Sequence, residues 1–232
     1  MIPVFDVAVI IVSYHSGDYL DRCLQALAAQ TVRPRQVLLI DNASQDGSVE
    51  QAERRYPWLT VIRCPENYGF AAANNRAVAQ SAATEWLALL NPDAFPAPNW
   101  LAVLQQATQD DPRYALFGCR LLDAADPERL DGVGDSYHAS GLAWRRGHGQ
   151  PAAGRYVQAE EIFAPCAAAA LYRRAAFLEA GGFDERFFCY MEDVDLGFRL
   201  RLLGYRCGYV PTAIVHHVSS GTTGARSPFT VS

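Results

Sequence analysis

Short apolar runs alternate with longer, more polar segments in the first part of the chain. The apolar runs carry no charge and are rich in aliphatic side chains, which is typical of strands buried on both faces of a parallel sheet. They cover Val7–Val12, Val37–Ile40, Leu59–Ile62 and Trp86–Leu90. The intervening segments are expected to be helices, and they cover residues 20–27, 48–56 and 71–79. This alternation predicts an α/β domain built on a mostly parallel sheet.

The second part of the chain has a less regular pattern. Helices are expected over residues 98–110 and 173–180 and from residue 192 onward, and strands over 114–122 and 205–215. Residues 123–154 are rich in Gly, Asp and Arg and have weak periodicity. Because long irregular segments in compact domains are usually functional or mobile, a partly disordered functional loop is expected there.

Composition narrows the class of protein. The chain has 232 residues, enough for one large domain, and its net charge of −5 indicates no basic surface for nucleic acid. The apolar runs are too short for a membrane-spanning helix, and the first residues lack the basic start of a signal peptide, so a cytoplasmic protein is expected. Six cysteines without a Cys-x-x-Cys pair indicate buried thiols, and neither a disulfide framework nor a zinc site.

Polar side chains follow two buried strands at the points where the strands end. Asp93 follows Trp86–Leu90 and Pro92, and Asp41 directly follows Val37–Ile40. Ligands of open parallel sheets bind beyond the carboxyl ends of the strands, so Asp93 is well placed for a metal ion and Asp41 for a nucleoside. Both stretches also fit ordinary turns, in which Asn, Ser and Asp satisfy local backbone groups. The first strand is not followed by Gly-x-Gly-x-x-Gly, which argues against a dehydrogenase-type site.

A second acidic cluster opens a helix near the end of the chain. Glu192, Asp193 and Asp195 lie in its first turn, where acids stabilise the helix dipole and cap free amides. Three carboxylates in four residues exceed what capping requires, so the cluster is a candidate acid–base site. The last strand ends in His216 and His217, whose side chains must point to opposite faces of a regular strand.

Six stretches, in this order, resemble the inverting glycosyltransferases of the family 2 type with the GT-A fold, and among them the rhamnosyltransferase-like branch that acts on bacterial cell-surface polysaccharides. The stretches are VAVIIVSYHSGDYLDRCLQAL, VLLIDNASQDGS, ENYGFAAANNRAV, WLALLNPDA, GGFDERFFCYMEDVDLGFRLRLLGYR and AIVHHVSSGTTG. The resemblance implies a Rossmann-like, mostly parallel sheet flanked by helices, with a smaller mixed sheet on the acceptor side. It also implies a single domain over residues 1–232, with a nucleotide-sugar-binding half (1–95) and an acceptor-binding and catalytic half (96–232).

The resemblance assigns roles in donor binding. Val12 and Tyr14 would flank the base of the nucleotide sugar, and Asp41 would accept its imide hydrogen. The remaining donor residues would be Asn67, Gly69, Asn75 and Asn91. Asn91-Pro92-Asp93 stands where the family has its DxD-type motif, so Asp93 would be a ligand of Mg²⁺ or Mn²⁺. His216 would be the second metal ligand, with His217 as the alternative.

The resemblance also implies the chemistry. Asp193 would be the general base for an acceptor hydroxyl, and Glu192 would orient the acceptor. The donor would be a dTDP- or UDP-sugar, and the rhamnosyltransferase-like branch favours rhamnose as the sugar. The acceptor would be a saccharide, free or lipid-linked. A lipid-linked acceptor would bring the protein to the inner face of the membrane. The resemblance implies no oligomeric state.

Two other functions stay open at the level of sequence. A sugar nucleotidyltransferase would need a glycine-rich basic loop after the first strand, but Val12-Ser13-Tyr14-His15 has no Lys or Arg. A binding module without turnover is the other alternative, because Asn91 replaces the first acid of the motif and the chain ends at Ser232, where many family members continue.

Overall fold

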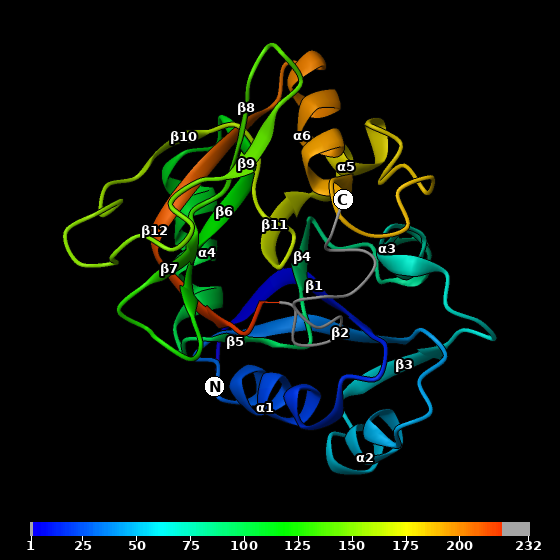
Figure 1. Cartoon of the computed structure of the whole chain (residues 1–232). Helices are drawn as coiled ribbons and strands as arrows, with labels where there is room; N and C mark the ends of the chain where they lie inside the picture. Colours follow the sequence, from blue (N-terminus) through cyan, green and yellow to red (C-terminus); the bar gives the residue numbers. More distant parts are fainter. Residues whose placement is uncertain (1, 220–232) are drawn as a thin grey trace.

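The computed structural model describes residues 2–219 and forms an α/β structure around one large sheet (Figure 1). The helices are α1 (Gly17–Ala28), α2 (Ser48–Arg55), α3 (Gly69–Gln80), α4 (Trp100–Asp110), α5 (Arg174–Glu179) and α6 (Glu192–Leu202). The strands are β1 (Val4–Ser13), β2 (Arg33–Asp41), β3 (Leu59–Arg63), β4 (Trp86–Leu90), β5 (Ala94–Pro96), β6 (Tyr114–Asp123), β7 (Leu130–Gly132), β8 (Asp135–Tyr137), β9 (Ala143–Arg145), β10 (Glu160–Ile162), β11 (Ala169–Arg173) and β12 (Arg206–His217). The predicted α/β class is confirmed.

The first half of the sheet is parallel, in the order β3-β2-β1-β4. The apolar runs of the sequence supply its strands, and β4 is buried at all of its positions, Trp86–Leu90. Ser13 at the end of β1 pairs with Asp41 at the end of β2, so the polar stretches that follow these strands meet at one edge. That edge is the usual place for a ligand in an open parallel sheet.

The second half continues the same sheet. β11 lies antiparallel between β4 and β6, with Ala170 opposite Leu89 on one side and Gly118 on the other. β12 is parallel to β6, and the main path of the sheet ends at β10. The smaller sheet of the described chain is the β8–β9 hairpin, which is separate from the main sheet.

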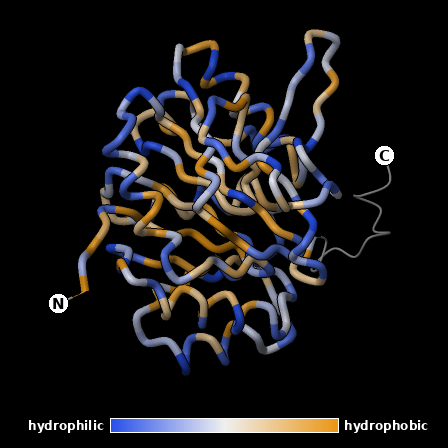
Figure 2. The backbone as a smooth tube through the Cα atoms, turned by 90° about the vertical axis from the view of Figure 1, so that its left-hand side faces the viewer, coloured by the Kyte–Doolittle hydropathy of each residue, from blue (hydrophilic) through white to orange (hydrophobic). Residues whose placement is uncertain are grey.

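Helices cover both faces of the sheet and bury two hydrophobic clusters. Because side chains alternate along β1, Val9 packs on the face of α1, α2 and α4, whereas Ile10 packs on the face of α3, α5 and α6. Figure 2 shows hydrophobic segments running through the middle of the molecule. Within residues 2–219, none of the helices has the length and hydropathy needed to cross a membrane.

Residues 123–154 differ from the expected partly disordered loop. They contain β7, β8 and β9, and Leu130 and Val133 are buried in the core. The strands have three residues each, too few to produce a recognisable alternation in the sequence. β7 pairs with β6, which places this segment against the main sheet.

Gly69 at the start of α3 provides a stability test. Its φ is +79°, and a Cβ there would overlap the backbone oxygen of Phe188, which accepts a hydrogen bond from Phe70 N at 2.7 Å. Gly47 has nearly the same φ, +76°, but open space around it. We expect Gly47→Ala to cost about 1–2 kcal/mol for the left-handed backbone alone. Gly69→Ala should cost a further ~1–3 kcal/mol, because Phe188 must move. Urea unfolding of both variants measures the difference, and equal costs would contradict the close packing at Gly69.

Candidate active site

A cavity of about 750 Å³ opens where β1, β4 and α6 meet. Its walls combine the ends of the parallel strands, the β8–β9 hairpin and the start of α6. Residues that line it include Val12, Tyr14, Asn42, Asn67, Gly69, Asn91, Asp93, Asp135, Trp144, Arg145, Phe188, Tyr190, Met191, Glu192, Asp193 and His217. Most of the residues singled out in the sequence therefore share one cavity, although they come from opposite ends of the chain.

The wall formed by β1 and α3 is organised by Asn42, which the sequence analysis did not select. Its side-chain amide donates to Asn67 Oδ1 at 2.7 Å and to the Gly69 carbonyl at 3.2 Å, and its Oδ1 accepts from Tyr68 N at 2.9 Å. Asn42 directly follows Asp41, so its place in the same polar stretch was the available signal. These bonds fix the loop before α3 against the end of β2.

Two of the expected donor residues lie outside the cavity lining. Asp41 is buried beside Asn42, and its Oδ1 accepts a hydrogen bond from Ser44 N at 2.8 Å. The side chain of Asn75 donates to the Phe183 carbonyl at 2.8 Å and accepts from Phe183 N at 3.0 Å. The amide of Asn75 thus holds the loop before α6, and its role in donor binding stays a prediction.

Asp93 lies beside His217, not beside His216. The Nε2 atom of His217 is 3.4 Å from Asp93 Oδ1 and 3.5 Å from Asn91 Nδ2. His216 faces a different hollow, lined by Arg22 and Ala124 among others. The structure therefore places His217, the alternative that the sequence left open, and not His216, beside Asp93.

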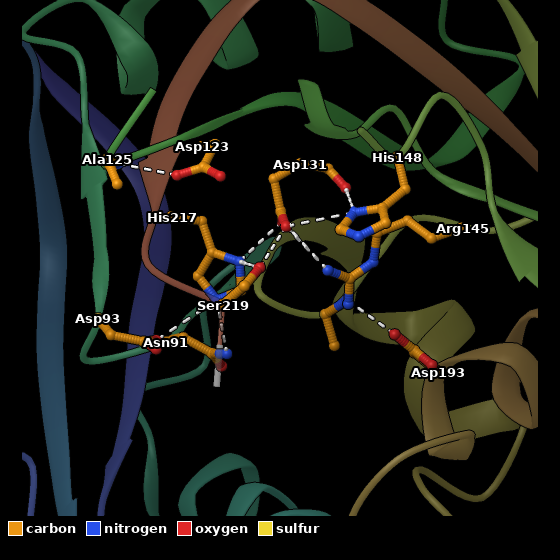
Figure 3. A network of polar contacts seen from close by, with 11 residues as sticks. Asn91, Asp93, Asp123, Ala125, Asp131, Arg145, His148, Asp193, His217 and Ser219 are labelled. Atoms are coloured by element: carbon orange, nitrogen blue, oxygen red, sulfur yellow. Dashed lines mark hydrogen bonds and ion pairs between the residues drawn. The ribbon is translucent and has the colours of Figure 1, made fainter. Parts of the chain in front are cut away.

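His217 and Asp93 belong to a buried network centred on Asp131 (Figure 3). Asp131 is 1% exposed, and its carboxylate accepts from His217 Nδ1 at 2.8 Å, from Arg145 Nη1 at 3.1 Å and from Ser219 Oγ. Burial alone would raise the pKa of Asp131, but the hydrogen bond from His217 and the charge of Arg145 lower it to about 2. Burial alone would lower the pKa of His217, but the bonds to Asp131 and Asp93 raise it to about 9.

The donor atoms around Asp93 fit a divalent cation. The close approach of Asp93 Oδ1 and His217 Nε2 shows that a carboxylate and an imidazole nitrogen converge on one point at the cavity wall. In residues 2–219, no group of three or more His, Cys, Asp or Glu side chains forms a complete metal site. Mg²⁺ in phosphate-transferring sites is commonly held by one or two carboxylates together with the phosphates of the substrate. Asp93 and His217 could therefore hold a cation whose remaining ligands are phosphate oxygens of the substrate.

Asp193, at the start of α6, lies on the opposite side of the Asp131–Arg145 pair from Asp93 (Figure 3). Asp193 accepts hydrogen bonds from Ala167 N at 3.0 Å and from Val194 N at 2.9 Å, which fix the direction of its carboxylate. Asp135 also lines the cavity, and burial together with the charge of Asp193 raises its pKa well above the usual range. Burial and repulsion by the neighbouring carboxylate therefore favour the protonated form of Asp135.

Glu192 is the second acid of this group. It is 5% exposed, and its Oε2 has no hydrogen-bond partner among the described residues although Glu192 lines the cavity. Burial and the charge of Asp193 raise its pKa to about 8. At neutral pH Glu192 is therefore mainly protonated and able to donate a hydrogen bond into the cavity.

The pKa of Glu192 predicts how its replacement changes stability with pH. The ordinary pKa of a glutamate is 4.5, so between pH 4.5 and about 8 Glu192 is ionised in the unfolded chain but keeps its proton in the folded protein. The unfolded chain therefore binds fewer protons, and the free energy of unfolding falls as pH rises through this window. Glu192→Gln cannot ionise. From pH 5 to pH 8.5 we expect the variant to gain stability relative to the wild type by more than about 1.4 kcal/mol, the equivalent of one pKa unit. Urea unfolding at both pH values measures the change, and a loss at pH 8.5 would show that ionised Glu192 is stabilising.

The sequence matches a family model. The model is described as Glycosyl transferase family 2, and it matches residues 8–181. The N-acetylglucosaminyl-diphospho-decaprenol L-rhamnosyltransferase of Mycobacterium tuberculosis is 34% identical over 237 residues, covering 93% of this chain and 77% of that protein. The O-antigen biosynthesis protein RfbC of Myxococcus xanthus is 29% identical, covering 92% of this chain but only 17% of that protein.

Solved structures share the fold at low sequence identity. The crystal structure of GalNAc-T7 with UDP, GalNAc and Mn²⁺ matches with a TM-score of 0.74 and 17% identity, covering 91% of this chain and 43% of that chain. The mannosyltransferase PcManGT from Pyrobaculum calidifontis in complex with GDP-Man and Mn²⁺ matches with a TM-score of 0.66 and 19% identity, covering 95% of this chain and 58% of that chain. The chain thus spans about half the length of these two proteins.

Proposed function

Since the chain belongs to glycosyltransferase family 2, we propose that it transfers a sugar from a nucleoside-diphosphate donor to a hydroxyl of a saccharide acceptor, with inversion at the anomeric carbon. The observation that carries the proposal is that Asp93 with His217, and Asp193 with Glu192, face one cavity at the carboxyl edge of the sheet. The first pair suits a diphosphate bound through a cation, and the second suits proton transfer from an acceptor.

The donor nucleoside would lie against the wall formed by Val12, Tyr14 and Asn67. Tyr14 is 41% exposed, so its ring is available for stacking on a base. The Asn42 amide holds Asn67 and the Gly69 carbonyl in place, which gives this wall a fixed shape before the donor arrives. The name of the mycobacterial relative suggests the sugar, since that protein is named as a rhamnosyltransferase; a rhamnosyl donor is therefore the first one to test.

Asp93 and His217 would hold Mg²⁺ or Mn²⁺ together with the donor diphosphate, and Asn91 would contact the same group from beside them. When bound, the cation would neutralise the negative charge that develops on the departing nucleoside diphosphate. The two structural neighbours, GalNAc-T7 and PcManGT, were both solved with Mn²⁺, which supports a divalent cation in this fold.

Asp193 would act as the general base. Its carboxylate would take the proton of the acceptor hydroxyl as that oxygen forms a bond to the anomeric carbon and the bond from this carbon to the donor phosphate breaks on the opposite face. The two backbone N–H groups that bond Asp193 hold its oxygens toward the cavity throughout. Glu192, which keeps its proton at neutral pH, would donate a hydrogen bond to the acceptor and orient it.

The acceptor would enter beside the β8–β9 hairpin. Trp144 on β9 is 53% exposed and lines the cavity, so its indole can stack on a sugar ring. The mycobacterial relative is named for a lipid-linked N-acetylglucosamine, which supports a lipid-linked saccharide as the acceptor class and a working position at the membrane surface.

Replacing Trp144 tests the acceptor side. Trp144→Ala is expected to raise the KM for the acceptor roughly 10-fold, because the indole would cover the apolar face of a sugar ring and losing an apolar contact of this kind costs on the order of 1.4 kcal/mol. The donor affinity should stay unchanged. Trp58 is also exposed, at 42%, but it contacts Tyr56 and lies outside the cavity lining, so Trp58→Ala is the matched control. An equal change of KM in both variants, or none in Trp144→Ala, would remove Trp144 from the acceptor site.

Turnover assays test the proposed function. The purified protein is incubated with dTDP-rhamnose, UDP-sugars or GDP-sugars, Mn²⁺ and a short-chain polyprenyl diphosphate carrying N-acetylglucosamine, and the product is analysed by mass spectrometry and NMR. The proposal predicts one glycosylated product with the anomeric configuration opposite to that of the donor. A product that retains the configuration contradicts the inverting mechanism, and formation of a nucleotide sugar from a sugar phosphate would establish a nucleotidyltransferase. Donor binding without turnover would establish a binding module.

A further inference from the structure

Asp131 occupies an unusual position for an acid, because it is almost completely buried and carries a charge. Such a charge is tolerated only where partners compensate its lost hydration. His217, Arg145 and Ser219 donate to its carboxylate, and the ring nitrogen Nδ1 of His148 lies 3.7 Å away. These residues come from β9, from the loop after it and from the end of β12, so Asp131 joins three separate parts of the cavity wall.

The contact with His217 has a directional consequence. An imidazole ring has two nitrogens, and Asp131 Oδ2 engages Nδ1 at 2.8 Å, which leaves Nε2 directed toward Asp93 at 3.4 Å. A histidine that binds a metal commonly donates its other ring N–H to a carboxylate, which fixes the orientation of the ring and raises its basicity as a ligand. We propose that Asp131 is a positioning residue, which holds the His217 ring so that Nε2 and the Asp93 carboxylate are presented together to a divalent cation.

The sheet holds Asp131 in this position. Gly132 of β7 pairs with Leu121 of β6, and the next residue of β6, Leu122, pairs with His216 of β12. Asp131 and His217 are therefore brought together by strand pairing on both sides of β6, although they lie 86 residues apart in the chain. The inference rests on the cation site of the proposed function, but it concerns the affinity of that site and not the transfer step.

Binding of Mn²⁺ alone tests the inference without any turnover. Free Mn²⁺ is measured by electron paramagnetic resonance during titration of the wild type, Asp131→Asn and Asp126→Asn. Replacing a carboxylate that supports a metal-binding histidine typically weakens metal binding about 10- to 100-fold, which is the loss expected for Asp131→Asn. Asp126 carries the same charge in the same segment but forms an exposed pair with Arg129, so Asp126→Asn should bind Mn²⁺ within about twofold of the wild type.

A double-mutant cycle separates positioning from general damage. If Asp131 acts through His217, then Asp131→Asn changes the Mn²⁺ affinity less than about threefold once His217→Asn is present. The full loss in both backgrounds, or an unchanged affinity in Asp131→Asn alone, overturns the inference. If Asp131→Asn does not fold, the test is repeated with the double variant Asp131→Asn/Arg145→Gln, in which no arginine charge is left without its partner. A wild-type protein that transfers sugar but binds no Mn²⁺ also overturns the inference, while the transferase activity stands.

Discussion

Asp193→Asn is expected to lower the kcat of sugar transfer by roughly 10²–10⁴-fold, the usual contribution of a general base. Asparagine keeps the shape of the side chain, and its single oxygen can accept one of the two hydrogen bonds from Ala167 N and Val194 N, but it cannot take a proton from the acceptor. The affinity for the donor should remain close to that of the wild type, because Asp193 lies on the acceptor side of the cavity. Steady-state kinetics and donor titration of the same preparation measure the two quantities.

Asp195→Asn is the matched control for Asp193→Asn. Both changes remove one carboxylate from the first turn of α6, so both alter the helix dipole by the same amount. The carboxylate of Asp195 pairs with Arg199 at 2.6 Å and does not line the cavity. Its replacement should therefore leave kcat within a factor of a few. An equal loss in both variants would mean that the acids act through the helix and not as a base.

Asp93→Asn and His217→Asn are each expected to lower Mn²⁺-dependent turnover by roughly 10²–10³-fold, the size of effect seen when one electrostatic stabiliser of a transition state is removed. The physical reason is that each variant removes one of the two side chains proposed to hold the cation, which lie together at the cavity wall. Raising the Mn²⁺ concentration should recover part of the activity. Turnover is measured across a Mn²⁺ series for both variants.

His216→Asn separates the two histidines in the same assay. His216 is adjacent in sequence but faces the hollow lined by Arg22 and Ala124, so its replacement should leave the Mn²⁺ dependence unchanged. Loss of Mn²⁺ dependence in His216→Asn, with normal behaviour of His217→Asn, would reverse the choice between them.

The strand ends were predictable from the sequence because their signal is local. A buried apolar run such as Trp86–Leu90 is recognisable from its composition, and parallel strands bring their carboxyl ends to one edge. The sequence could therefore place Asp93 at this edge of the sheet, where it lines the cavity. The start of α6 was predictable for the same reason, since its acids stand directly before an apolar helical face.

The residues that the sequence did not identify depend on contacts that no local pattern records. Asp131 meets His217 across 86 residues, and Asn42 meets Asn67 across 25. The choice between His216 and His217 was equally hidden, because the pairing of β12 with β6 shifts register between Val210 and Ile214, and this irregularity breaks the simple alternation of faces along the strand.

The most direct test of the central claim is the melting temperature of the wild-type protein with UDP, dTDP or GDP, each with Mn²⁺ or with a chelator. A nucleotide at a hundred times its dissociation constant stabilises a protein by about 2.7 kcal/mol, which corresponds to roughly 5–10 °C in a chain of this size. The account predicts such a shift for at least one nucleotide, and it predicts that the chelator abolishes most of it. A shift that survives the chelator would contradict the cation site at Asp93 and His217, and no shift with any of the nucleotides would contradict the assignment of the cavity to a nucleoside-diphosphate sugar.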